Sequence, residues 1–82
     1  MTKYITGHNV PGYLPESEPE EHETLQDAKD SLIWWIGKYI EYMVECDEDY
    51  TKAEQTLEEF KNAPAQECNV YIGDYVYWIT KD

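Results

Sequence analysis

Arginine is missing from this sequence of 82 residues, and its six lysines stand against 18 aspartates and glutamates, which gives a formal net charge of −12. Such a chain repels nucleic acids and anionic membranes, because both are densely negative. We therefore expect no direct nucleic-acid binding and no membrane attachment. The charge favours a basic protein as partner, and basic surfaces occur most often on proteins that bind nucleic acid. The alternative is that the charge only maintains solubility.

Long apolar segments are absent too. No apolar run approaches the roughly 18 residues that cross a bilayer, and the N-terminus has one lysine but no apolar stretch of the signal-peptide kind. We therefore expect a cytoplasmic protein. Cysteine is scarce, and in that compartment Cys46 and Cys68 are expected to be reduced thiols rather than a disulfide.

Motifs of catalysis and cofactor binding are also missing, since there is no P-loop, no G-x-G-x-x-G sequence, no nucleophile elbow and no C-x-x-C pair. His8 and His22 lie among many carboxylates in an irregular segment, which is more typical of solvated surface than of a metal site. Cys46 projects onto the apolar face of a predicted helix, which argues against a catalytic thiol. We expect no enzymatic activity, no cofactor and no metal.

Aromatic residues are plentiful by contrast: three Trp, eight Tyr and one Phe make up 15% of the chain. This content favours a packed globule over a disordered chain. The length suits one small domain over residues 1–82. Residues 3–6 are short and β-prone, and we expect them to form a strand that Gly7 ends.

Residues 7–23 are rich in proline and glutamate and suit neither a helix nor a strand. They form either a disordered acidic arm or an ordered loop whose prolines lower the entropy cost of ordering. We expect an ordered loop at least through Pro15, and greater mobility over residues 16–23, where acids dominate. Three apolar residues of the loop are spaced to lie across an uncovered sheet face: Val10, Tyr13 and Leu14.

A first helix is predicted for residues 24–45. Thr24 is a good N-cap, and Asp27 takes the place of the usual Glu in a capping box. The acids from Asp47 onward oppose the helix dipole, so the helix should end near Glu45. Its apolar side chains fall along one stripe at helical spacing: Leu25, Ala28, Leu32, Trp35, Ile36, Tyr39, Met43 and Cys46, flanked by Ile33 and Ile40.

A shorter helix is predicted for residues 50–62, capped by Asp47 or Asp49 and ended by Asn62 and Pro64. Because the connection is short, the two helices should pack antiparallel. The second helix also has an apolar stripe, with spacings of three, four and three: Tyr50, Ala53, Leu57 and Phe60.

Residues 69–79 predict a β-hairpin. Two β-branched and aromatic runs flank Gly73-Asp74, and glycine at the first turn position indicates a type II′ turn that pairs Ile72 with Tyr75. Val70 then pairs with Tyr77. The face expected toward the helices carries Val70, Ile72, Tyr75, Tyr77 and Ile79, and the other face carries Tyr71, Val76 and Trp78.

These elements predict an α+β fold of order β-α-α-β-β. A helical pair should pack on one face of a small three-stranded antiparallel sheet, which the strand around Tyr4 completes because a lone hairpin is marginally stable. The loop of residues 7–23 should cover the other face.

Trp34 lies roughly opposite the apolar stripe of its helix, with Asp30 one turn before it and Lys38 one turn after. Either the second helix or the loop covers it, or it is an exposed anchor among acids, which is the composition of an interface hot spot. Carboxylates four residues apart on a helix stand roughly 6 Å apart, near the spacing of phosphates along a strand. The candidate partner-binding residues are therefore Trp34, Asp30, Glu41, Glu45, Glu54 and Glu58.

Several stretches resemble a group of small acidic bacteriophage proteins without an assigned activity: residues 4–7 (YITG), 12–19 (GYLPESEP), 28–33 and 72–79 (IGDYVYWI). In size, charge and origin, such proteins resemble anti-CRISPR and anti-restriction inhibitors, several of which mimic nucleic acid. The resemblance implies a protein of the host cytoplasm and brings no catalytic residues.

The charge and the resemblance together predict a phage-encoded inhibitor that binds and blocks a basic, nucleic-acid-binding defence protein of the host. The most specific form is an anti-CRISPR protein that acts on a CRISPR–Cas complex by charge mimicry or steric blocking. The alternative is a small phage module that binds host transcription or replication proteins.

Overall fold

The computed structural model describes residues 3–13 and 18–81. It contains six elements in the order β1 (Tyr4–Asn9), β2 (Glu20–His22), α1 (Leu25–Glu45), α2 (Thr51–Asn62), β3 (Cys68–Ile72) and β4 (Tyr75–Lys81). The predicted α+β class is confirmed. The predicted three-stranded sheet and the order β-α-α-β-β are wrong, because part of the acidic segment forms the additional strand β2.

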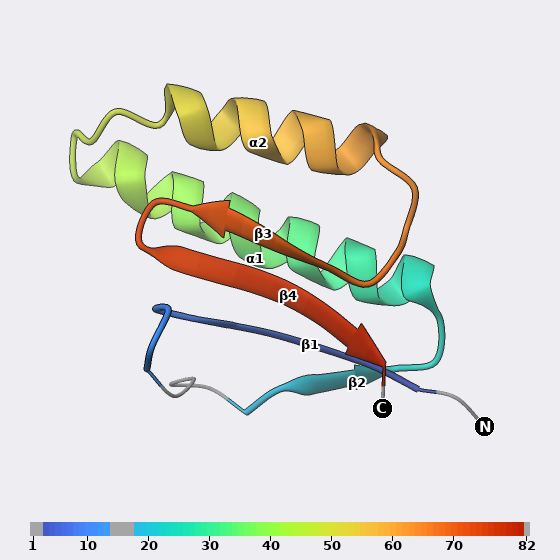
Figure 1. Ribbon diagram of the computed structural model, residues 1–82. Helices are drawn as coiled ribbons and strands as arrows, with labels where there is room; N and C mark the ends of the chain where they lie inside the picture. Colours follow the sequence, from blue (N-terminus) through green and yellow to red (C-terminus); the bar gives the residue numbers. More distant parts are fainter. Residues whose placement is uncertain (1–2, 14–17, 82) are drawn as a thin grey trace.

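The sheet is antiparallel throughout, with the strand order β2-β1-β4-β3. The first and last strands of the chain, β1 and β4, are therefore the two central strands of the sheet. Both helices lie behind one face of the sheet (Figure 1). The hairpin has the predicted register, with Ile72 opposite Tyr75 and Val70 opposite Tyr77. Gly73 has a φ of +58°, the left-handed conformation that the predicted turn requires at this position.

Strand β1 continues past Gly7 to Asn9, so the prediction that Gly7 ends the strand is wrong. Gly7 lies directly opposite Trp78 on β4. A Cβ atom at position 7 would overlap the Trp78 ring, so the indole occupies the space that glycine leaves. The Trp78 Nε1–H then donates a hydrogen bond of 2.8 Å to Asn9 Oδ1. Gly7 thus serves close cross-strand packing and not a chain turn.

Residues 20–22 form the short strand β2. The prediction that residues 16–23 are mobile is therefore wrong for residues 20–22. It pairs with β1, and the carboxylate of Glu20 accepts hydrogen bonds from Trp35 Nε1 (2.9 Å) and Ser31 Oγ (3.3 Å) on α1. His22 Nε2 lies 2.9 Å from the buried Thr6 Oγ1. β2 is therefore attached both to the sheet and to the helix.

The helix ends lie close to their predicted positions. Thr24 caps α1, and its side chain accepts the Asp27 N–H at 3.0 Å. Asp49 Oδ1 accepts the N–H of Thr51 at 3.0 Å at the start of α2. The two helices run antiparallel, as predicted (Figure 1).

The core lies between the helices and the sheet. The predicted stripe of α1 is confirmed at its centre, where Ala28, Leu32 and Ile36 are fully buried. Cys46 is exposed, so its predicted place on the core stripe is wrong, because it follows the last helical residue as the C-cap. The buried apolar residues are Ala28, Leu32, Ile36, Ile40, Met43, Ala53, Leu57, Phe60, Ile72, Tyr77 and Ile79, with Val76 on the far face of the sheet.

A buried lysine joins the two helices. Lys29 on α1 is only 6% exposed. Its ammonium group donates to the backbone carbonyls of Lys61 (2.8 Å) and Ala63 (2.6 Å) and lies 5.8 Å from the centre of the Phe60 ring. These carbonyls belong to the C-terminal end of α2, where the helix dipole favours a cation. Lys29 thus fixes the end of α2 against α1.

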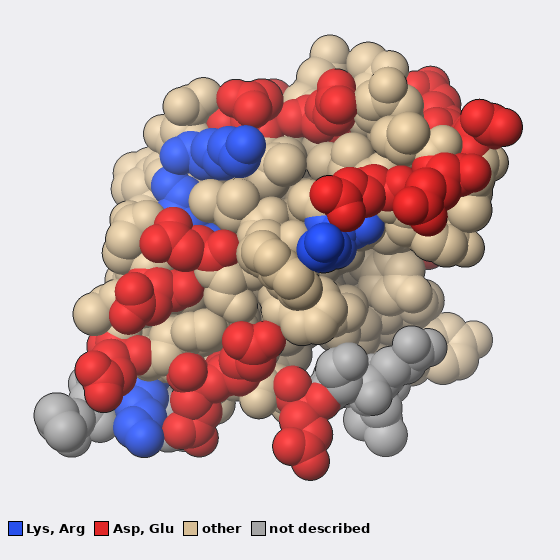
Figure 2. All heavy atoms as spheres, turned by 180° about the vertical axis from the view of Figure 1, so that it is seen from behind, with Lys and Arg blue, Asp and Glu red and all other residues tan. Residues whose placement is uncertain are grey.

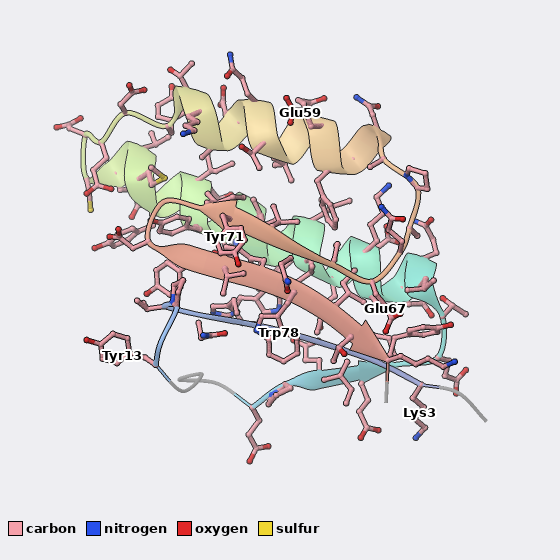
Figure 3. All side chains as sticks on the ribbon, viewed as in Figure 1. Lys3, Tyr13, Glu59, Glu67, Tyr71 and Trp78 are labelled. Carbon is pink, nitrogen blue, oxygen red and sulfur yellow. The ribbon has the colours of Figure 1, made fainter. Side chains whose placement is uncertain are left out.

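The face of the sheet opposite the helices is only partly covered. Tyr71 is 66% exposed, while Val76 is buried and Trp78 half-buried. Tyr13, which was expected to cover this face, is 73% exposed and points away from Tyr71 and Trp78 (Figure 3). That prediction is wrong for Tyr13. Of the other two residues in it, Val10 is half-buried and Leu14 lies outside the described residues.

Candidate functional site

The six predicted partner-binding residues are all exposed and all lie on the helices. We call this set the acidic helical face: Asp30, Trp34, Glu41 and Glu45 on α1, and Glu54 and Glu58 on α2. Figure 2, which views the molecule from behind, shows carboxylates spread widely over this side. Asp30 and Glu45 are 15 residues apart on one helix, or roughly 22 Å at 1.5 Å per residue. The structure therefore presents an extended surface and not one compact cluster.

Trp34 is 56% exposed, so neither α2 nor the described part of the loop covers it. Its ring makes an edge-to-face contact with Trp35 at a centroid distance of 5.0 Å. Lys38 Nζ lies 5.4 Å from the centre of the Trp34 ring and 3.4 Å from a Glu41 oxygen. Trp34 is thus held by a half-buried neighbour and a cation while much of its ring remains open to solvent.

A shallow groove lies between the helices beside this surface. Its volume is about 320 Å³, and its lining residues are Gly37, Ile40, Glu54, Leu57, Glu58 and Lys61. Gly37 follows Trp34 by three residues and precedes Glu41 by four, so it continues the outer surface of α1 into the groove. Apart from the backbone of its own helix and its two chain neighbours, no described atom lies within 4 Å of where a Gly37 Cβ would be. The groove therefore brings Glu54 and Glu58 alongside the centre of the α1 surface.

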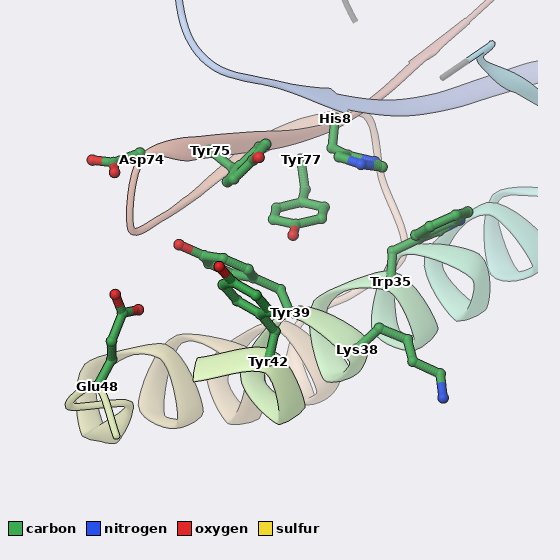
Figure 4. Close-up of a pocket in the computed structure, with 9 residues that line it drawn as sticks. All are labelled: His8, Trp35, Lys38, Tyr39, Tyr42, Glu48, Asp74, Tyr75 and Tyr77. Atoms are coloured by element: carbon green, nitrogen blue, oxygen red, sulfur yellow. The ribbon is translucent and has the colours of Figure 1, made fainter. Parts of the chain in front are cut away.

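A second and larger hollow opens between α1 and the β3–β4 hairpin. We call it the aromatic pocket; its volume is about 510 Å³, and it is lined by His8, Trp35, Lys38, Tyr39, Tyr42, Glu48, Asp74, Tyr75 and Tyr77 (Figure 4). Volumes of roughly 300–1,000 Å³ are usual for ligand pockets. Trp35 and Lys38 connect the pocket to the exposed Trp34.

The rings of the pocket pack against one another. His8 stacks on Tyr77 with a centroid distance of 5.2 Å and an interplanar angle of 23°, and it lies 5.1 Å from Trp35. Tyr39 meets Tyr75 edge to face at 5.2 Å. The predicted solvated position of His8 is therefore wrong, because β1 pairing places it opposite Tyr77 on the face toward α1.

Two chain turns place carboxylates at one end of the pocket. Asp47 takes the left-handed conformation after α1 (φ 57°), and the Glu48 N–H donates back to Met43 O at 2.9 Å. This is the Schellman pattern of helix termination, and it directs Glu48 toward the pocket. The tight Gly73-Asp74 turn lies against the Tyr39 hydroxyl and places Asp74 near the same end (Figure 4).

This end of the pocket carries negative charge, from Asp74 and Glu48. Burial first, and then the charge of Asp74, raise the pKa of Tyr39, with a smaller contribution from Glu48; a backbone hydrogen bond from Asp74 opposes them. Burial raises the pKa of Tyr77. Lys38 is the one cation in the lining, and its side chain points away from the tyrosines (Figure 4). The pocket thus combines aromatic faces with the carboxylates of Asp74 and Glu48.

Sequence reasoning missed the pocket, although part of the signal was available. The hairpin register placed Tyr75 and Tyr77 toward the helices, and Tyr39 lies one turn after Trp35 on the same helix. The sequence pattern predicts that all three tyrosines lie in the core, but of the three only Tyr77 is buried. The contribution of His8 depends on the pairing of β1 with β4, which no local pattern indicates.

Among residues 3–13 and 18–81, no group of His, Cys, Asp and Glu side chains is arranged to hold a metal ion. Cys46 and Cys68 are free thiols. Neither described helix is both long and apolar enough to span a bilayer. Comparison with protein-family models, curated proteins and solved structures found no match for this chain.

Proposed function

We propose that this chain is a non-enzymatic binding protein that attaches through its acidic helical face to a basic surface on a nucleic-acid-binding protein. The observation that supports this most is the exposure of Trp34, at 56%, within a surface of exposed carboxylates on α1 and α2. A large aromatic side chain surrounded by charge is the composition of an interface anchor.

The carboxylates support a basic partner. Glu41 and Glu45, and likewise Glu54 and Glu58, are four residues apart on their helices, so each pair stands roughly 6 Å apart on one side. This spacing resembles that of phosphates along a nucleic-acid strand. A net charge of −12 steers a basic partner toward this surface over long range.

The resemblance to small acidic phage proteins gives this function a specific form. We propose a phage-encoded inhibitor in the host cytoplasm that occupies the positively charged channel of a CRISPR–Cas complex, where guide and target strands are otherwise held. The second candidate is a module that binds host transcription or replication proteins, which also present basic surfaces.

The test is a competition experiment. Purified CRISPR–Cas effector complexes of several types, loaded with guide RNA, are incubated with this protein before labelled target DNA is added, and DNA binding is measured by gel shift. We expect at least one complex to lose DNA binding in proportion to the added protein. Trp34→Ala should reduce this inhibition, whereas Tyr71→Ala, which truncates an exposed tyrosine on the sheet, should not.

The outcomes separate the two candidates. The second candidate is supported if this protein blocks the DNA binding of host polymerase or replication proteins and leaves CRISPR–Cas complexes unaffected. If no basic nucleic-acid-binding protein responds, the acidic surface serves solubility and the proposed function is wrong.

A further inference from the structure

The rings of the aromatic pocket are only partly taken up by packing. Tyr77 belongs to the buried core, whereas Trp35, Tyr39 and Tyr75 pack half-buried against its edge. Tyr42 is 57% exposed, although it lines a hollow beside other rings. A hollow of about 510 Å³ is left open between these rings.

The faces of aromatic rings attract cations, and the attraction grows when water is displaced. Here the rings of Tyr39, Tyr42 and Tyr75 surround a hollow whose one end carries Asp74 and Glu48 (Figure 4). Both carboxylates act on the same Tyr39 hydroxyl, so their fields add at that end. The lining therefore fits a positively charged group with an apolar stem.

Arginine fits this lining better than other cations. Its planar guanidinium stacks on aromatic faces, and its fixed N–H groups donate to carboxylates. A quaternary ammonium would use the rings but could donate nothing to Asp74 or Glu48. The chain has no arginine of its own, and its one lysine in the lining, Lys38, is turned toward Trp34 and Glu41.

We propose that the aromatic pocket receives one arginine side chain of the partner protein, which stacks among Tyr39, Tyr42 and Tyr75 and donates to Asp74 and Glu48. The proposal rests on the proposed function only in taking the partner to be a basic protein. The pocket adjoins Trp34 through Trp35 and Lys38. An arginine in the pocket and the Trp34 ring would therefore anchor neighbouring parts of the same interface.

The experiment uses the full chain and a minimal probe, the peptide acetyl-Gly-Arg-Gly-amide. The isotope-labelled protein is titrated with this peptide, and backbone amide shifts are followed by NMR. We expect saturable shifts at the pocket, with a Kd on the order of 1 mM, the range of a single weakly held group. Matched peptides carry citrulline, lysine or trimethyllysine in place of arginine.

Four substitutions locate the site. Glu48→Gln and Asp74→Asn remove the acceptor charges, and we expect each to weaken arginine binding about threefold to tenfold. Tyr42→Ala should weaken it about threefold without disturbing the core, because Tyr42 is mostly exposed. Glu59→Gln, an exposed carboxylate on α2, should have no effect.

The proposal is supported if the arginine peptide saturates the pocket, binds more tightly than the other three peptides and loses affinity in the pocket variants alone. Equal binding of citrulline, or tighter binding of trimethyllysine, would overturn it. Shifts spread over the acidic surface without saturation at the pocket would also overturn it. The peptide titration does not depend on whether the protein inhibits a partner. The pocket proposal can therefore fail while Trp34-dependent inhibition is observed, and the inhibition can fail while the pocket binds arginine.

Discussion

Gly7 and Gly37 differ in the free space beside their Cα atoms. A Cβ at Gly7 would overlap the Trp78 ring, whereas a Cβ at Gly37 would meet no described side chain and no other element within 4 Å. We predict that Gly7→Ala lowers the free energy of unfolding by about 1–3 kcal/mol, because the indole must move. Gly37→Ala should raise it by about 0.5–1 kcal/mol, because alanine favours the helix.

Urea denaturation of both variants measures these changes, and the Trp78 indole N–H resonance reports whether its bond to Asn9 is kept. An unchanged stability for Gly7→Ala would mean that β1 and β4 do not pack as described. A destabilised Gly37→Ala would mean that the groove beside α2 is closed in solution.

Lys29 holds the C-terminal end of α2 against α1. Its ammonium group bonds two carbonyls at the end of α2. Hydrogen bonds to a charged group contribute roughly 1.5–3 kcal/mol, so Lys29→Met should destabilise the fold by about 2 kcal/mol. Lys52→Met, on the exposed side of α2, is the control and should have almost no effect. Equal effects of the two substitutions in thermal denaturation would contradict this role of Lys29.

At the scale of elements, the attachment of β2 to α1 depends on Glu20. Its carboxylate accepts from Trp35 and Ser31, and β2 itself has only three residues. We predict that Glu20→Ala accelerates amide exchange in β2 and lowers stability by about 1 kcal/mol. Glu23→Ala, in the exposed turn before α1, should change neither quantity. Rapid exchange of β2 in the unmodified protein would show that the strand is not stably formed.

The elements that sequence reasoning predicted are those with strong local signals. The hairpin register follows from Gly73 and alternating β-formers, and α1 follows from Thr24 and its apolar stripe. β2 could not be predicted in this way, because Glu20, Glu21 and His22 have neither the alternation nor the composition of a strand. The segment is ordered by partners distant in sequence, namely β1 and Trp35.

The candidate site was predictable to a similar extent. The exposed side of α1 follows from helical periodicity, which placed Trp34 opposite the apolar stripe. The pocket required His8, Asp74 and Glu48 to meet α1, and that depends on strand order and on the turn after α1. The burial of Lys29 could not be predicted from the neighbouring sequence either, because lysine side chains are usually solvated.

At the scale of the whole molecule, the aromatic content makes stability sensitive to alkaline pH. The pKa values of Tyr77 and Tyr39 are raised by burial above the ordinary value of 10.0. The folded state therefore holds these protons more tightly than the unfolded state does. This contribution is constant below about pH 10 and is lost as pH rises further. We predict a urea midpoint that falls steeply above pH 10.

Tyr77→Phe tests the cause, because phenylalanine fills the same space without an ionisable group. Its urea midpoint should fall less steeply above pH 10 than that of the unmodified protein. Tyr71→Phe, at an exposed position, should leave the slope unchanged. Identical slopes for all three proteins would show that ionisation of Tyr77 is not coupled to unfolding.

We propose that the acidic helical face binds a basic partner and that Trp34 anchors the contact. Biolayer interferometry from low to high salt measures the rates of association and dissociation with an inhibited nucleic-acid-binding protein. Exposed charges act within about 8 Å at physiological ionic strength. Glu54→Lys with Glu58→Lys should therefore slow association and flatten its salt dependence.

Trp34→Ala should instead speed dissociation at every salt concentration, with a loss of about 2 kcal/mol or more in binding free energy, because a desolvated anchor governs the lifetime of a complex. Circular dichroism of each variant confirms that the helices are intact. We therefore expect two separate responses, one in association and one in dissociation. Binding that is unchanged by both the charge reversals and the loss of Trp34 would show that the acidic helical face is not the binding surface.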